Sequence, residues 1–179
     1  QSYGIRSIAS GDVSLTSVGT ITTNGVLAAG IYGTSNTGNA TVNSTGDVTV
    51  VGDVARALGA TAAGDGDATV ISQGNLSTDG DAAFGISAIV TGTGIASVNS
   101  QGNVTTQGDA SFGIIATTGG GGEARVNTVG NIQTVGINSD GIVASSGDGF
   151  VEVISDGDIT TDGLNAEGIL AYVSNTSPS

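Results

Sequence analysis

Apolar residues alternate with polar ones in short runs, and the runs recur along the chain at a fixed distance. Each repeat holds three such runs, separated by turns rich in Gly, Asp and Asn. Alternation with a period of two is typical of a β-strand with one buried face. No window shows a sustained period of 3.6, so the pattern predicts three short strands per repeat and no long helix.

Paired glycines set the length of the repeat. The two members of each pair lie six residues apart, and the first members follow one another after 27, 28, 28, 28 and 27 residues. A fixed period of this size is typical of stacked repeat architectures, in which each repeat is one supersecondary unit. The pairs are Gly19/Gly25, Gly46/Gly52, Gly74/Gly80, Gly102/Gly108, Gly130/Gly136 and Gly157/Gly163.

Aliphatic residues recur at equivalent positions when the repeats are aligned on the first glycine of each pair. One column lies four residues before it and another twelve residues after it. We predict an all-β fold, a right-handed parallel β-helix (β-solenoid) of about six 27–28-residue coils with three strands each, whose equivalent residues stack about 4.8 Å apart. The predicted core columns are Leu15, Val42, Val70, Val98, Val126 and Val153, and Ile31, Leu58, Ile86, Ile114, Ile142 and Ile169.

The repeat covers almost the whole chain. We expect residues 1–173 to form a single β-helix segment, a slice of a longer rod, and residues 174–179 to be a disordered tail. A further column of hydroxyl residues has inward parity, and we expect it to form a hydrogen-bonded ladder along the rod. Its members are Ser17, Ser44, Ser72, Ser100, Thr128 and Ser155.

Charge and composition exclude several classes of partner. With 16 acidic residues, three Arg and a net charge of −13, the chain lacks the basic face that nucleic acid or anionic lipid requires. No apolar run of about 18 residues occurs, so we expect no direct membrane insertion of this segment. The absence of Cys and His excludes disulfides and Ser–His or Cys–His nucleophiles.

Acidic residues gather in the turns. Asp79, Asp81 and Asp109 come from stacked repeats and are weak candidates for a surface Ca²⁺ site. Close acidic pairs could also serve glycoside hydrolysis, but turns favour Asp on conformational grounds alone, and we interpret these residues as solvated turns. We predict no catalytic residue and no cofactor. Phe84 and Phe112 share a repeat position, which favours a stacked pair over a ligand platform.

Gly157-Asp158-Ile159-Thr160-Thr161-Asp162-Gly163, followed by Gly168-Ile169-Leu170-Ala171, shows the repeat best. This register resembles the passenger regions of bacterial autotransporter adhesins, and the resemblance extends from about Gly4 to Tyr172. It implies a right-handed β-helix that is exported through a C-terminal membrane β-barrel and lies outside the bacterial cell, at its surface. Two-partner-secreted filamentous exoproteins have a similar composition.

The resemblance suggests a function without catalysis. We expect a passenger segment that acts as a stalk, a binding surface or both, with a host-cell receptor, a matrix protein, a glycan or another copy as partner. The alternative is a polysaccharide-active β-helix enzyme that uses Asp carboxylates. The third hypothesis is an ice-binding β-solenoid, for which the outward column of Thr22, Thr49, Ser77, Thr105, Gln133 and Thr160 is the candidate.

Overall fold

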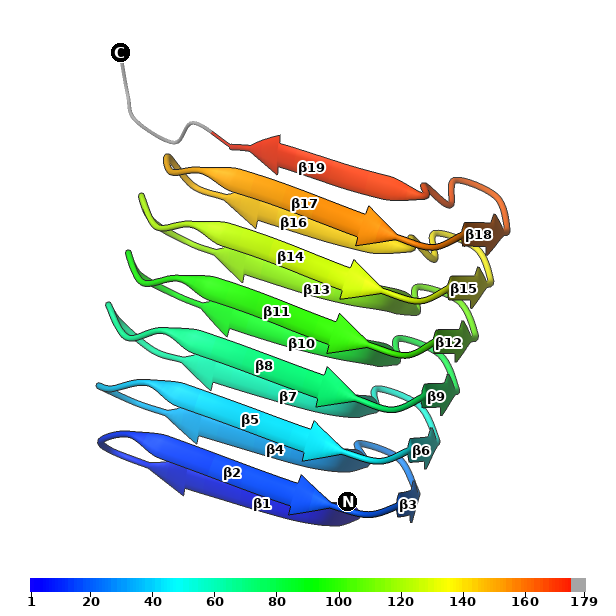
Figure 1. Cartoon of the computed structure of the whole chain (residues 1–179), viewed down its shortest axis with the longest axis horizontal. Coiled ribbons are helices and arrows are strands. Elements are labelled where there is room, and N and C mark those ends of the chain that lie inside the picture. The colour runs from blue at the N-terminus through cyan, green and yellow to red at the C-terminus, as the bar shows by residue number, and fades with distance from the viewer. Residues whose placement is uncertain (175–179) are drawn as a thin grey trace.

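The chain folds as a parallel β-solenoid of about six turns, each of about 28 residues. The computed structural model describes residues 1–174, in which 19 strands form three parallel sheets (Figure 1). The predicted three strands per coil and the all-β class are confirmed. The tail expected over residues 174–179 lies outside the described residues except for Ser174, whose amide donates to the carbonyl of Ser146 at 2.8 Å.

Each coil contributes one strand to each sheet. Sheet A has seven strands: β1 (Tyr3–Ala9), β4 (Ala29–Ser35), β7 (Arg56–Ala62), β10 (Phe84–Val90), β13 (Phe112–Thr118), β16 (Ile142–Ser146) and β19 (Ile169–Val173). Sheet B has six: β2 (Val13–Val18), β5 (Ala40–Thr45), β8 (Ala68–Gln73), β11 (Ala96–Gln101), β14 (Ala124–Val129) and β17 (Val151–Asp156). Sheet C also has six: β3 (Ile21–Asn24), β6 (Val48–Val51), β9 (Leu76–Asp79), β12 (Val104–Gln107), β15 (Ile132–Val135) and β18 (Ile159–Asp162).

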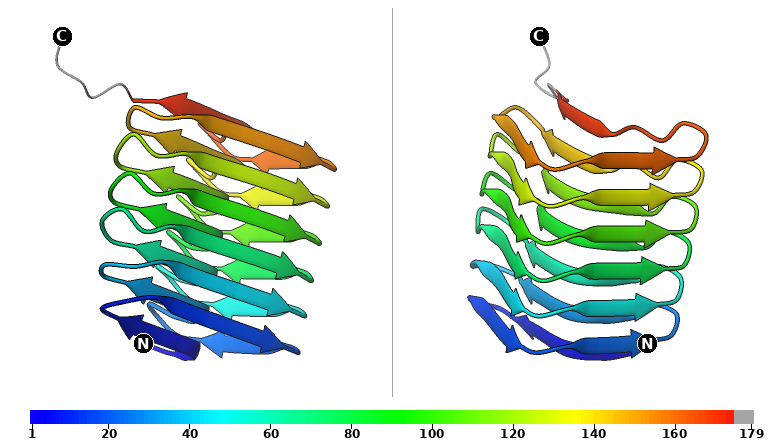
Figure 2. Two further views of the ribbon diagram at one scale, coloured as in Figure 1. Left: turned by 60° about the vertical axis from the view of Figure 1, so that its left-hand side comes forward. Right: turned by 45° about the vertical axis from the view of Figure 1, so that its right-hand side comes forward.

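The three sheets enclose one continuous core. The long strands of sheets A and B face each other and run in opposite directions, and the short strands of sheet C close one side (Figure 1). Turned views show the coils stacked directly above one another, with β1 at one end of the stack and β19 at the other (Figure 2). Every strand therefore pairs with the equivalent strand of the preceding or following coil.

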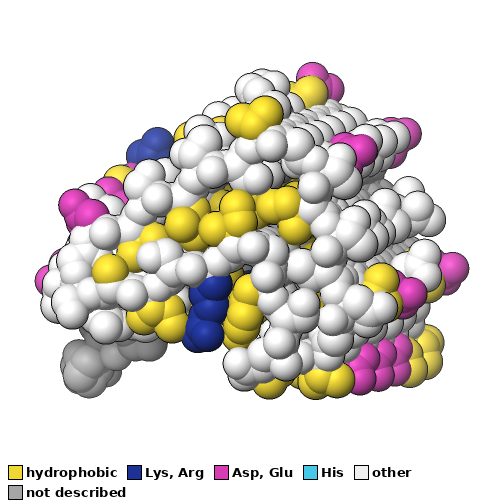
Figure 3. All heavy atoms as spheres, turned by 90° about the horizontal axis from the view of Figure 1, so that it is seen from below, with side chains coloured by type: hydrophobic (Ala, Val, Ile, Leu, Met, Phe, Trp, Pro, Cys, Tyr) yellow, Lys and Arg dark blue, Asp and Glu magenta, His cyan; other side chains and the backbone are white. Residues whose placement is uncertain are grey.

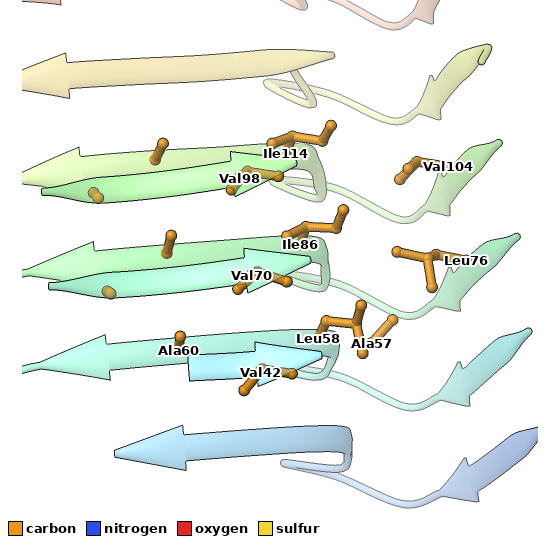
Figure 4. Packing of buried hydrophobic residues seen from close by; sticks show 14 of the residues in the cluster. Val42, Ala57, Leu58, Ala60, Val70, Leu76, Ile86, Val98, Val104 and Ile114 are labelled. Atoms are coloured by element: carbon orange, nitrogen blue, oxygen red, sulfur yellow. The ribbon is translucent and has the colours of Figure 1, made fainter. Parts of the chain in front are cut away.

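Strand register produces the aliphatic columns. Val98 pairs with Val70 on one side and Val126 on the other, and Ile86 pairs with Leu58 and Ile114. The inner members are at most 1% exposed and point into the space between the sheets (Figure 4). Members of the end coils are less covered because they have a neighbouring coil on one side only: Leu15 and Val153 are partly buried, and Ile169 is 48% exposed.

Glycine is required at the corners for two reasons that Gly102 illustrates. Its φ of +121° lies in a region that L side chains rarely adopt. A Cβ built on it would lie 2.3 Å from the carbonyl oxygen of Gly74, the equivalent glycine of the previous coil. The backbones of successive coils therefore approach too closely at this corner for any side chain.

Besides the glycines, one residue with a side chain has a positive φ in each coil. It lies two residues after the second glycine of the pair, and its φ is between 52° and 58°. Asn is common in this conformation, but a β-branched residue such as Val54 is rarely found there. The column consists of Leu27, Val54, Ala82, Ala110, Asn138 and Asn165.

We expect Val54→Asn to stabilise the protein by about 1 kcal/mol, because it removes left-handed backbone strain and the Val54 side chain is already 44% exposed. Asn occupies the same position in two later coils. Urea unfolding followed by circular dichroism measures the change. Val51→Asn is the matched control, since Val51 is an exposed residue of β6 with no positive φ. An equal or larger gain from the control would contradict the strain argument.

Candidate functional site

The outer face of sheet A differs from the rest of the surface. Five of the six aromatic residues lie on its strands, as do two of the three arginines. Seen from the end of the stack that carries β1, a basic side chain lies between hydrophobic ones, while acidic groups lie towards the rim (Figure 3). The sheet A residues are Tyr3, Arg6, Tyr32, Arg56, Phe84, Phe112 and Tyr172. We call the first six of these the aromatic–arginine cluster.

Guanidinium groups of the cluster stack on aromatic rings. Arg6 Cζ lies 4.5 Å from the centre of the Tyr3 ring, and Arg56 Cζ lies 4.6 Å from the centre of the Tyr32 ring. Arg56 also approaches the Phe84 ring at 5.8 Å. These distances are within the range of cation–π attraction. Phe84 and Phe112 stack with their ring centres 5.7 Å apart, which confirms the stacked pair predicted from their shared repeat position.

Strand register assembles the cluster from residues far apart in the chain. Phe112 pairs with Phe84, Phe84 with Arg56, and Arg56 with Ala29. Ala29 in turn pairs with Tyr3. The short side chain of Ala29 therefore leaves a gap between the longer side chains of its two neighbours.

Gly59 allows the cluster to pack closely. A Cβ at Gly59 would lie 2.8 Å from Cδ of Arg56, 2.9 Å from a Tyr32 ring carbon and 3.0 Å from Oγ of Ser87. The space that any other residue would fill is therefore occupied by the Arg56 stem and the Tyr32 ring. This arrangement holds the guanidinium over the aromatic ring.

The Tyr32 phenol is tied to the sheet at its far end, where its oxygen lies 3.2 Å from Oγ1 of Thr61. Burial alone raises the pKa of this phenol. Hydrogen bonds with the hydroxyls of Thr34 and Thr61 lower the pKa, as do the charges of the two nearby guanidinium groups. The lowering effects prevail, so the Tyr32 pKa lies below its ordinary value of 10.0.

The cluster's arginines have unused donors. Within residues 1–174, neither the Arg6 guanidinium nor the Arg56 guanidinium makes an ion pair or donates a hydrogen bond to the protein. Arg125 on sheet B differs, because its guanidinium lies 2.6 Å from a carboxylate oxygen of Glu123 and 3.9 Å from one of Glu152. Two positive charges in a strongly acidic chain are thus stacked on aromatic rings and left without an anionic partner.

A shallow cavity of about 100 Å³ lies beside Arg56, and we call it the Ala29 notch. Ala28 and Ala29 contribute their small side chains to its lining. Aromatic, aliphatic and polar groups surround them. The complete lining consists of Gln1, Tyr3, Leu27, Ala28, Ala29, Tyr32, Val54 and Arg56.

The acidic turns have a backbone role that the sequence interpretation missed. Oδ1 of Asp81 accepts the amide of Asp109 at 2.9 Å, and Oδ1 of Asp109 accepts the amide of Ile137 at 2.8 Å. Asp79 lies exposed at the end of β9 instead. Over residues 1–174, no group of three or more acidic side chains is arranged to hold a metal ion. Two of the three candidate Ca²⁺ ligands therefore link successive coils.

A second ladder uses the Asp or Asn that follows the first glycine in five of the six pairs. Oδ1 of Asp47 accepts the amide of Asn75 at 2.8 Å, and Asn75, Asn103 and Asn131 repeat the contact in the following coils at 2.9–3.1 Å. The Asx side chain is long enough to reach the next coil. These bonds supply partners for turn amides that the sheets leave unpaired.

Thr93 gives one acidic turn an additional bond. Its hydroxyl and its amide both donate to Oδ1 of Asp65, at 2.8 and 3.1 Å, and these bonds lower the pKa of that carboxyl. Because the Asp65 pKa is lower in the folded state than in the unfolded state, the ionised carboxylate stabilises the fold at pH values above the unfolded-state pKa. That contribution is lost as the pH falls through the folded-state value.

The expected ladder of inward hydroxyls does not form. The column is buried in the inner coils, but Ser44, Ser72, Ser100, Thr128 and Ser155 have no hydrogen-bond partner within the described part of the chain. Equivalent atoms of neighbouring coils are separated by the strand spacing of about 4.8 Å, which exceeds hydrogen-bond length. The prediction was wrong because the hydroxyls of this column lie one strand spacing apart along the stack, too far for one to reach the next.

Fold and surface together define a parallel β-solenoid repeat protein. Comparisons with protein-family models, curated proteins and solved structures give no match to this chain. Residues 1–174 contain no helix with the length and apolar character needed to cross a membrane.

We expect Ca²⁺ to stabilise the protein weakly and only at millimolar concentrations. Acidic turns in successive coils repel one another, and a divalent ion reduces that repulsion without a dedicated site. Calorimetric titration should show no saturation at micromolar Ca²⁺, and sodium chloride should suppress the rise in melting temperature. A saturable micromolar isotherm that disappears when Asp81 and Asp109 are replaced by Asn would instead establish a specific metal site.

Proposed function

We propose that this chain is a non-catalytic, extracellular segment of a bacterial surface adhesin. Its stacked coils act as a stiff stalk, and the outer face of sheet A is the surface that contacts a host-cell receptor, a matrix protein or a glycan. The resemblance of the repeat to autotransporter passenger regions supports export to the cell surface. This family assignment is part of the proposal.

The aromatic–arginine cluster is the observation that carries the proposal. Outer positions of the other two sheets are mostly Ser, Thr, Asn and Gln, whereas sheet A presents stacked aromatic rings and two guanidinium groups without anionic partners. Aromatic residues and Arg are the types enriched at binding hot spots. Their concentration on one face favours recognition over a purely mechanical role.

Two alternatives have weaker support. A polysaccharide-active enzyme needs paired carboxylates in a groove, whereas Asp81 and Asp109 accept backbone amides in turns. An ice-binding surface needs a flat array of outward Thr. The candidate column on sheet C is interrupted by Ser77 and Gln133, and its outward neighbours include Val51 and Asp79.

Adhesion of beads that carry the purified chain tests the proposal directly. The beads are presented to epithelial cells, to matrix proteins and to a panel of neutral and acidic glycans. Ile89→Lys with Ile115→Lys places two charges on the outer face of sheet A, and Asn99→Lys with Asn127→Lys places two on sheet B. We expect the sheet A variant to lose adhesion and the sheet B variant to retain it.

Adhesion that survives the sheet A changes, or no adhesion to any surface, would reject the proposed role. The same glycans, assayed for new reducing ends and unsaturated products, test the enzymatic alternative. Product formation that is lost in Asp79→Asn or Asp156→Asn would favour that alternative.

A further inference from the structure

We propose that the Ala29 notch binds the carboxylate-bearing sugar of an acidic glycan, with Arg56 as the anion-binding group. This inference rests on the proposed adhesive function and names the class of ligand that the sheet A face takes.

The Arg56 guanidinium is positioned to bind a carboxylate. It is held between the rings of Tyr32 and Phe84, and its stem fills the space above Gly59. Among the described residues it has no carboxylate partner and donates no hydrogen bond. A guanidinium fixed in this way presents its N–H groups in a planar fork that fits the two oxygens of a carboxylate.

Other groups in the notch suit a sugar ring. The rings of Tyr3 and Tyr32 and the side chain of Leu27 offer apolar surface for the C–H face of a pyranose, while Ala28 and Ala29 leave room for it. Polar groups are close by, because the Tyr3 hydroxyl donates to Oε1 of Gln1 at 3.3 Å. A few polar groups in a mostly apolar cavity are typical of ligand sites.

Notch size and sheet pairing favour one sugar residue over an extended peptide. The cavity of about 100 Å³ is smaller than deep ligand pockets, so it accommodates one terminal group of a larger molecule. Both strands at its centre, β4 and β7, are paired on each side within sheet A. A peptide therefore has no free strand edge beside Arg56 on which to add.

The notch occurs once in its column. Two coils further along, the same position is filled by Phe84 and then by Phe112, whose rings stack on each other. Ala29 is the one short residue between Tyr3 and Phe112 in that column. The natural use of Phe at equivalent positions also shows that the coil accepts a large side chain there.

Two monosaccharide probes that differ only in the carboxylate test the inference. Methyl β-D-glucuronide and methyl β-D-glucoside are titrated into the whole chain, and binding is followed by amide chemical shifts in NMR spectra. We expect the glucuronide to bind about tenfold more tightly or better, because its carboxylate, unlike the neutral hydroxymethyl group of the glucoside, can accept charge-assisted hydrogen bonds from the Arg56 guanidinium. Shifts should concentrate around Ala29 and Arg56 and weaken with added salt.

Variants locate the site. Arg56→Gln removes the charge, and Ala29→Phe fills the notch with the residue found in later coils; each should reduce glucuronide affinity at least tenfold. Arg125→Gln is the control, because Arg125 is paired with Glu123 on another sheet. Melting curves confirm that each variant is folded. Arg56→Gln and Ala29→Phe test the site independently, because one removes the charge and the other fills the cavity.

Several outcomes would overturn the inference. These are equal binding of the two sugars, no detectable binding of the glucuronide, or unchanged affinity in Arg56→Gln. Tighter binding of an N-acetyl-aspartyl peptide than of the glucuronide would assign the notch to an acidic peptide instead. Bead adhesion that depends on sheet A but is not inhibited by the glucuronide rejects this inference alone, whereas absence of adhesion rejects the proposed function.

Discussion

Val98→Asp is expected to destabilise the protein by several kcal/mol or to prevent folding. Val98 is 1% exposed and lies between Val70 and Val126 in the middle of the stack, so an Asp there would be a buried charge without a partner. The melting temperature and the urea midpoint measure the loss.

Thr105→Asp is the matched control. Thr105 is partly exposed on the outer face of sheet C, where it pairs with Ser77 and Gln133. An Asp at this position remains solvated, so we expect a change of no more than about 0.5 kcal/mol. Equal losses for the two variants would contradict the assignment of inward and outward columns.

Gly102→Ala is expected to cost about 2–4 kcal/mol, although it adds a single methyl group. The new Cβ would lie 2.3 Å from the Gly74 carbonyl oxygen and 2.7 Å from its carbonyl carbon, and the φ of +121° is unfavourable for Ala. Backbone atoms cannot move aside as a flexible side chain can, so the two coils must separate locally. Chemical unfolding measures the cost.

Gly121→Ala is the control, because it shows whether any replacement of Gly by Ala lowers stability or only one at a corner where successive coils touch. A Cβ at Gly121 meets no atom within 4 Å, and its φ is not positive. Its stability should be unchanged or slightly raised, because Ala reduces the freedom of the unfolded chain. A comparable loss in both variants would show that coil stacking is not the reason for glycine at position 102.

Features that repeat in every coil could be predicted from the sequence. The aliphatic columns through Val98 and Ile86 follow from period and parity, and the need for glycine at positions such as Gly102 follows from their fixed spacing. Each of these positions is constrained by an equivalent residue in the coil above and in the coil below. The periodic signal is therefore repeated six times.

Other features depend on distances that the alignment of repeats does not contain. The left-handed backbone conformation at Val54 could not be predicted from the residue type, because Val rarely adopts it. Asn138 and Asn165 at the equivalent position were the one indication of it. Parity placed Ser100 inside the rod, but the coil spacing decides that its hydroxyl finds no partner.

The candidate binding site was missed for a different reason. Arg56 and Ala29 break the pattern of their column, and a method that aligns repeats treats such departures as noise. The side chains that surround Arg56 and Ala29 are Tyr3, Tyr32 and Phe84, and they come from neighbouring coils. Aromatic or Arg residues at otherwise variable outward positions were the available signal.

Pairing between successive coils also determines how the molecule would respond to tension. The hydrogen bonds of all three sheets join one coil to the next, and the first and last strands, β1 and β19, lie at opposite ends of the stack. Pulling on the ends loads the outermost coil first, so coils detach in sequence rather than together. A folded coil occupies about 4.8 Å along the stack. Once it detaches, its stretch of about 28 residues can extend to at most about 95 Å. Under load such a solenoid would lengthen in steps and dissipate work while its remaining coils stay folded.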